Sequence, residues 1–219
     1  MDSSYVDLAD PTHLEFAYLR WMRIALRAAG ARRVLHVGGG ACALARALAA
    51  EDPGGRQLVC EVDAGVLALA REHLGLRRQP GLRVRHAEGR ACIAGQADKS
   101  WDAVVIDAFI DATVPRSLIT VEALGDAARV SPLTLINVVD DHAGNELRTV
   151  AAGLAEVYPQ VWSVGAPSGN IVLAGDAANV DTDRVATQAA ADSAPAWLTP
   201  PGTIARLISG TSPLRDEDP

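Results

Sequence analysis

VLHVGGGACALARALAA, residues 34–50, joins a short apolar run to three consecutive glycines and then to a helical pattern of apolar residues. A strand followed at once by a helix is the repeating unit of parallel sheets, in which ligands bind beyond the carboxyl ends of the strands. Gly38, Gly39 and Gly40 permit left-handed torsions and a close approach of backbone to a ligand. The helix that follows offers free N–H groups at its N-terminus. We therefore expect a ligand-binding turn at these glycines.

The rest of the chain repeats this unit. Apolar runs predict five parallel strands at 33–37, 57–62, 82–86, 102–107 and 133–139, with helical spacing between them. Two further runs, 160–164 and 170–174, flank a Gly/Pro/Ser turn and predict an antiparallel hairpin. The prediction is an α/β three-layer sandwich whose mostly parallel, seven-stranded sheet ends in that hairpin. This Rossmann-like arrangement resembles the class I S-adenosylmethionine-dependent methyltransferases.

We divide the 219 residues into three parts. Residues 1–30 form an N-terminal segment with a helix over 10–29, because Asp10 and Pro11 are a good helix start. Residues 31–176 form a nucleoside-binding domain of the methyltransferase type. Residues 177–219 read as a linker, a short helix and a flexible C-terminal tail.

Composition limits the possible function classes. The formal net charge of −7 argues against a nucleic-acid surface, and no apolar run is long enough to span a membrane. Three widely spaced cysteines without a CxxC pair predict neither a disulfide nor a metal site. The acidic, polar start does not resemble a signal peptide. We therefore expect a cytoplasmic protein that acts on a small molecule, and base rates favour a homodimer.

Acidic residues recur where the predicted strands end. Glu61 follows Gly38 by 23 residues, the spacing at which a carboxylate binds ribose hydroxyls. Asp63, close by, suits either the same site or the cap of the next helix. Glu88 lies with Gly89 after the third strand, where an adenine amine would bind, and Asp107 follows four apolar residues at the end of the fourth. Together these positions predict a nucleoside site.

The segments VLHVGGG, CEVD, AEGRA, DAVVIDAF, NVVDD and GNIVLAG resemble the spermidine synthase-like proteins, especially a compact actinobacterial-type branch without the N-terminal β-domain. That resemblance implies transfer of an aminopropyl group from decarboxylated S-adenosylmethionine to an amine acceptor such as a polyamine. On the donor side it implies that the three glycines lie at the sulfonium, with Ala108 beside the donor. It implies that Glu61 and Asp63 bind the ribose and that Glu88 and Gly89 flank the adenine. On the acceptor side, Asp107 would be the catalytic base facing the amine, and Asp111, with Asp140 or Asp141, would be further acids for a cationic substrate.

Three departures from the family pattern keep alternatives open. Ala41 stands where synthases carry an acid for the donor's ammonium group, and the acceptor motif is stretched from Asp107 to Asp111. Few residues precede the first strand. A methyltransferase that binds S-adenosylmethionine itself is the second hypothesis, because Ala41 removes a charge that would repel the methionine carboxylate. A non-catalytic relative that keeps the fold for binding or assembly is the third.

Overall fold

The computed structural model describes residues 4–76, 79–140 and 144–218. Its elements in chain order are α1 (Ala17–Ala28), β1 (Arg33–Gly38), α2 (Ala43–Glu51), β2 (Arg56–Glu61), α3 (Ala64–His73), β3 (Leu82–His86), α4 (Gly89–Ala94), β4 (Ala103–Asp107), the 3₁₀ turn η1 (Arg116–Leu118), α5 (Val121–Val130), β5 (Leu133–Asp140), α6 (Asn145–Val157), β6 (Gln160–Gly165), β7 (Gly169–Asp176), α7 (Thr182–Ala190), β8 (Trp197–Thr199) and α8 (Pro201–Leu207).

The sheet has the strand order β3-β2-β1-β4-β5-β7-β6-β8. The first five strands in the chain run parallel to one another, and β7, β6 and β8 pair antiparallel. This confirms the predicted α/β class and the terminal hairpin. It adds an eighth strand, because β8 pairs with β6 at the far edge.

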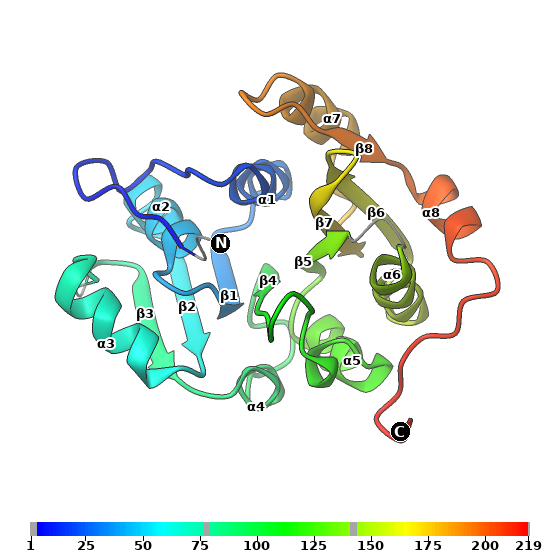
Figure 1. Ribbon diagram of the computed structural model, residues 1–219, viewed down its shortest axis with the longest axis horizontal. Helices are drawn as coiled ribbons and strands as arrows, with labels where there is room; N and C mark the ends of the chain where they lie inside the picture. The colour runs from blue at the N-terminus through cyan, green and yellow to red at the C-terminus, as the bar shows by residue number, and fades with distance from the viewer. Residues whose placement is uncertain (1–3, 77–78, 141–143, 219) are drawn as a thin grey trace.

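Helices cover both faces of the sheet (Figure 1). One face carries α4, α5 and α6 over a core that includes Leu35, Val104 and Ile136. The other face carries α1, α2 and α7 over residues that include Val105 and Trp162. The strands are apolar on both sides because both sides are buried, which explains their near-continuous hydrophobic runs. No helix of the described residues is long and apolar enough to cross a membrane.

The N-terminal helix is shorter than expected. α1 begins at Ala17, not near residue 10. The Asp10 carboxylate accepts hydrogen bonds from the Thr12 N–H and hydroxyl, at 2.9 and 2.6 Å, and forms a local turn. The Asp-Pro start signal is thus used for a turn rather than for a helix.

Residues 177–195 were expected to form a linker or a frayed helix, and the structure shows a packed helix there. They contain α7, whose Val185 and Ala189 are buried against the α1 side of the sheet. Arg20 of α1 holds Asp192 by paired contacts of 2.9–3.1 Å. The sequence pattern was weak because α7 has few bulky apolar residues and depends on these tertiary contacts.

The flexible tail expected after α8 instead follows a defined path along α4 and α5. The Leu214 carbonyl accepts the Val121 N–H at 2.9 Å. Asp216 accepts two hydrogen bonds of 2.6 Å from Arg90 and one of 2.7 Å from the Thr120 hydroxyl. Polar contacts hold this segment, and a hydrophobicity pattern does not reveal them.

Candidate functional site

The glycine turn lies at the carboxyl end of β1, beside the end of β4. Gly38, Gly39 and Gly40 have φ values of +77°, +113° and +53°, which favour glycine. In the sheet register Gly38 stands opposite Asp107. A Cβ on Gly38 would lie 2.5 Å from the Asp107 carbonyl oxygen, whereas one on Gly39 would meet nothing within 4 Å. Gly38 therefore allows the two strands to approach, and Gly39 leaves open space.

That open space is part of a cavity of about 80 Å³. The glycine turn, Asp107 and Phe109 form its sheet side, and Phe16 and Tyr18 close it from the N-terminal segment. Asp107 is the single acidic side chain among the described residues that line it. The glycine turn and Asp107, both predicted to bind a ligand, therefore line the same cavity.

Asp107 is held by two donors. The Tyr18 hydroxyl donates to one carboxylate oxygen at 3.1 Å, and the Asn137 amide donates to the other at 2.9 Å. The Asn170 amide in turn donates to the Asn137 side-chain oxygen at 3.0 Å. Burial raises the pKa of Asp107 above its usual range, although these two hydrogen bonds oppose the shift. The result is an oriented carboxylate of increased proton affinity.

Asn137 and Asn170 were not predicted as site residues. Both lie in strands, and Asn137 interrupts the apolar run of β5. Asn137 is fully buried, where a polar side chain is costly unless it is hydrogen-bonded. A polar residue inside a strand that is otherwise apolar was the signal that could have identified it.

The N-terminal segment covers the glycine turn. The Ser4 hydroxyl accepts a hydrogen bond of 3.0 Å from the Ala41 N–H, one of the free donors before α2. The rings of Phe16 and Tyr18 stack with 6.1 Å between their centroids. Burial, together with the Asp107 carboxylate, raises the pKa of Tyr18, so its hydroxyl stays protonated as a donor.

Two other groups that line the cavity are uncharged at neutral pH. Burial lowers the pKa of His36 to about 4, and its ring bonds the Gln57 amide oxygen at 3.0 Å. Burial raises the pKa of Cys42 to about 12, so its thiol is not an activated nucleophile. Neither residue competes with Asp107 as the acid–base group of the cavity.

Glu61 ends β2 close to this site. Its side chain is buried, and its carboxylate accepts the Asp63 N–H at 3.0 Å. It lies near enough for its charge to help raise the pKa values of Cys42 and Asp107. It does not line the 80 Å³ cavity. Its expected role at a ribose stays a prediction.

Asp63 and Glu88 serve as helix caps. Asp63 accepts the N–H groups of Gly65 and Val66 at the start of α3. Exposed Glu88 accepts those of Arg90 and Ala91 at 2.9 and 2.7 Å at the start of α4. Neither lines the cavity. The capping interpretation raised for Asp63 applies to both residues, and their predicted contacts with a nucleoside stay untested.

Gly89 has a packing role at the start of α4. A Cβ there would lie 2.4 Å from a methyl carbon of Val37 and 3.1 Å from one of Leu118. Its lack of a side chain lets α4 pack closely against the end of β1. This does not depend on a ligand, and the predicted contact of Gly89 with adenine stays untested.

The structure brings fewer of the residues predicted beyond Asp107 to the cavity. Ala108 packs beside Gly38, because a Cβ added to Gly38 would lie 2.8 Å from the Cβ of Ala108. Asp111 is exposed, has a φ of +57° and belongs to the turn in which Ile110 pairs with Thr113. It does not line the cavity. The side chain of Asp140 and the whole of 141–143 lie outside the described residues.

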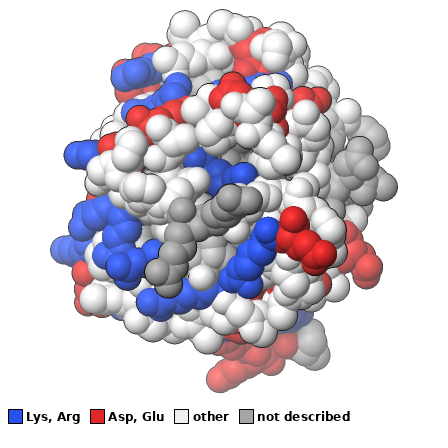
Figure 2. Space-filling model, turned by 90° about the vertical axis from the view of Figure 1, so that its left-hand side faces the viewer, with Lys and Arg blue, Asp and Glu red and all other residues white. Residues whose placement is uncertain are grey.

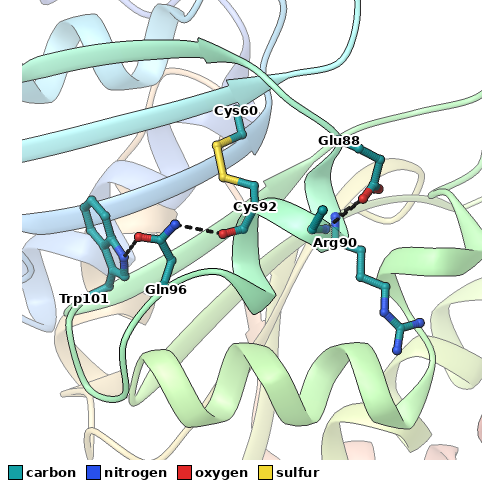
Figure 3. The surroundings of a disulfide bond; sticks show 7 residues. Cys60, Glu88, Arg90, Cys92, Gln96 and Trp101 are labelled. Carbon is teal, nitrogen blue, oxygen red and sulfur yellow. Dashed lines mark hydrogen bonds between the residues drawn. A yellow bond between two sulfur atoms is a disulfide. The ribbon is translucent and has the colours of Figure 1, made fainter.

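A disulfide joins Cys60 at the end of β2 to Cys92 in α4 (Figure 3). This corrects the expectation of no disulfide. The two cysteines are 32 residues apart in sequence and are brought within 6.5 Å between Cα atoms by the packing of α4 on β2. Cys42 stays free and buried. The cross-link therefore connects the segments that carry Glu61 and Glu88.

No group of three His, Cys, Asp or Glu side chains that could hold a metal is found among residues 4–76, 79–140 and 144–218.

Comparison with solved structures shows which proteins share this geometry. A probable spermidine synthase from Corynebacterium glutamicum superposes with a TM-score of 0.88 at 28% identity, over 99% of this chain and 86% of that one. In structure the chain is similar to a spermidine synthase over nearly its whole length. The resemblance extends from the N-terminal segment through the tail, because almost the whole chain is covered. No family model and no curated protein sequence matches.

More distant structures agree on the fold. A spermidine synthase from Thermotoga maritima matches with a TM-score of 0.66 at 19% identity, and another, solved with the transition-state analogue AdoDATO, with 0.67 at 20%. The spermidine synthase-like chain spans 62% and 64% of these two proteins. Human methyltransferase-like protein 13, in complex with SAH, matches with 0.66 at 18% identity.

Proposed function

We propose that this spermidine synthase-like protein is an alkyl-group transferase that binds an adenosyl sulfonium donor at the glycine turn and transfers an aminopropyl group to an amine acceptor. The observation that carries the proposal is the Asp107 carboxylate, which faces the cavity beside Gly38–Gly40 and is oriented by Tyr18 and Asn137. The solved relatives with AdoDATO and SAH support an adenosyl ligand.

The chemistry needs a neutral amine and a proton acceptor. The amine nitrogen attacks the carbon beside the sulfonium, the carbon–sulfur bond breaks, and methylthioadenosine leaves as a neutral thioether. The nitrogen then carries a positive charge and loses a proton. Asp107 suits this step, because a carboxylate whose pKa is raised by burial is a better base than one in water.

Methyl transfer from S-adenosylmethionine is the second candidate. Ala41 favours it, because position 41 has no carboxylate to attract the ammonium group of a decarboxylated donor or to repel the carboxylate of the intact one. Ala41 is buried beside Cys42 and gives its N–H to Ser4. A charge at position 41 would lie between Gly40 and Cys42, which both line the cavity.

Isothermal titration calorimetry with decarboxylated S-adenosylmethionine, S-adenosylmethionine and methylthioadenosine tests both candidates. Tighter binding of the decarboxylated donor, followed by methylthioadenosine release with an amine such as putrescine, is the expected result. A preference for S-adenosylmethionine supports methyl transfer. If none of the three binds, the protein keeps the fold without the chemistry.

The pair Ala41→Asp and Ala41→Asn separates charge from size at position 41. Asp should weaken S-adenosylmethionine binding and strengthen that of the decarboxylated donor, each relative to Asn. The two side chains are nearly isosteric, so a difference between them reports charge. Equal affinities in both variants would contradict the proposed position of the sulfonium substituent.

A further inference from the structure

The β3 edge of the sheet is strongly basic, and no other strand among the described residues covers it. β3 is the outermost strand; it pairs with β2, and apart from an isolated bridge between Gln79 and Leu82 at its start it has no other pairing among the described residues. Its Arg83 and Arg85 are exposed and point to one side, since alternate residues of a strand share a face. They stand opposite Leu58 and Cys60 in the register, so that side is the α4 face. Exposed Arg56, at the start of β2, belongs to the same face and lies 4.4 Å over the Trp101 ring.

A fourth arginine flanks the edge from the other face. Arg71 of α3 is exposed and, with Arg83 and Arg85, lines a hollow of about 640 Å³ along the strand. Figure 2 shows the blue side chains gathered on this side of the molecule, with the red ones mostly displaced to its margins. This concentration is notable in a chain of net charge −7.

These charges are not neutralised by any described residue. Arg71, Arg83 and Arg85 have no hydrogen bond or ion pair with any residue in 4–76, 79–140 or 144–218. By contrast, Arg20, Arg33, Arg90 and Arg129 are each paired with a carboxylate. Unpaired arginines on both flanks of an exposed strand leave the backbone edge and its charges available together.

We propose that the β3 edge binds an extended acidic segment of another protein, which adds to the sheet as a ninth strand. Backbone hydrogen bonds to a free edge supply one part of such binding, and side chains at alternate positions supply specificity. Carboxylates at every second residue of an extended chain repeat at about 6.6 Å. That repeat matches the spacing of Arg83 and Arg85, which are also two residues apart in a strand. Guanidinium groups bind carboxylates in pairs of hydrogen bonds.

Two other occupants fit less well. A second copy of this chain would bring one set of unpaired arginines against another if it paired through the same edge. Single-stranded nucleic acid binds by stacking its bases on aromatic side chains as well as by charge. The described residues around the hollow include no aromatic side chain.

The test measures fluorescence anisotropy with a labelled ten-residue peptide that alternates Glu and Thr. Its controls are the same peptide with Gln for Glu, and two versions with N-methyl groups on one or the other alternate set of amides. The full-length protein is compared with the double variant Arg83→Gln/Arg85→Gln and with Arg184→Gln. Arg184 is an exposed arginine of α7, away from this edge. Circular dichroism verifies that each variant folds.

We expect the double variant and the Gln peptide to weaken binding by about tenfold or more, and Arg184→Gln to leave it unchanged, since charge-assisted hydrogen bonds are the stronger kind. One N-methylated peptide should bind as the parent does and the other should lose affinity, because one set of amides faces β3. Equal binding by both N-methylated peptides, unchanged binding by the double variant, or tighter binding of a uridine oligonucleotide than of the peptide would each overturn the proposal.

Discussion

At the scale of single residues, the proposed chemistry depends on Asp107. Replacing it with Asn keeps the size of the side chain and removes the base. We expect Asp107→Asn to lower kcat/KM by about 10²–10⁴-fold, the usual contribution of a positioned general base. Methylthioadenosine release measures the rate, and calorimetry with methylthioadenosine should show that donor-side binding persists. Full activity in the variant would exclude Asp107 as the base.

The same substitution predicts a dependence of stability on pH. Because burial raises the pKa of Asp107 in the folded protein, the protonated carboxyl favours folding at low pH, and this stability is lost as the pH rises through the folded pKa. Asn does not titrate. Asp107→Asn should therefore unfold at a higher temperature than the wild type at pH 7, with the difference shrinking below the ordinary carboxyl range. Melting curves from pH 3 to 8 measure this, and a constant difference would contradict it.

Gly38 and Gly125 form a matched pair for backbone effects. In Gly38→Ala, the new methyl group would overlap the Asp107 carbonyl oxygen at a φ of +77°. We expect a loss of about 2–4 kcal/mol in unfolding free energy, from the left-handed torsion and the overlap. In Gly125→Ala, within α5, nothing lies within 4 Å and stability should rise by about 0.5–1 kcal/mol. Urea denaturation compares the two, and equal effects would contradict this account of the turn.

Sequence patterns predicted which strand ends lie together better than they predicted loop conformations and side-chain contacts. The glycine turn, Glu61 and Asp107 end neighbouring strands, so topology alone brings them to one edge of the sheet. Asp111 could not be placed this way, because its position depends on the torsions of a loop. The Asn137–Asn170 contact was equally hidden, since it joins β5 to β7 by an antiparallel register that the apolar pattern does not specify.

At the scale of elements, the link between β2 and α4 is the largest departure from expectation. Cysteine spacing carries no information about which helix lies over which strand, so a pair 32 residues apart could not be recognised. The chain-entropy model assigns a cross-link of that length about 3–4 kcal/mol of stability. We expect reductant to lower the melting temperature of the wild type and to leave a Cys60→Ala/Cys92→Ala variant unaffected.

Thiol titration in denaturant provides the control. One reactive thiol, that of Cys42, is expected without reductant and three with it. Cys42→Ala should reduce these counts to none and two. Three thiols before reduction would show that the bond does not form in solution, and would restore the earlier expectation from cysteine spacing.

At the scale of the whole molecule, the C-terminal tail joins elements from the middle of the chain. The Asp216 carboxylate accepts hydrogen bonds from Arg90 of α4 and from the hydroxyl of Thr120, just before α5. These contacts lower the pKa of Asp216 to about 2. A lowered carboxyl pKa contributes stability above the ordinary carboxyl range and loses it as the pH falls toward 2. Asp216→Asn should therefore lower the melting temperature slightly at pH 7 and not at pH 2. Asp218→Asn is the matched control, because Asp218 lies in the same tail and has no ion pair to a described residue.

The disulfide also changes what a cut in the chain would do. α3, β3 and the arginines Arg71, Arg83 and Arg85 all lie between Cys60 and Cys92. A protease that cleaves one peptide bond in that interval leaves two polypeptides joined by a covalent bond. The nicked protein would migrate at its full mass on a non-reducing gel and as two fragments on a reducing one. A single cut in the segment that carries the basic edge would therefore not release either fragment from the protein.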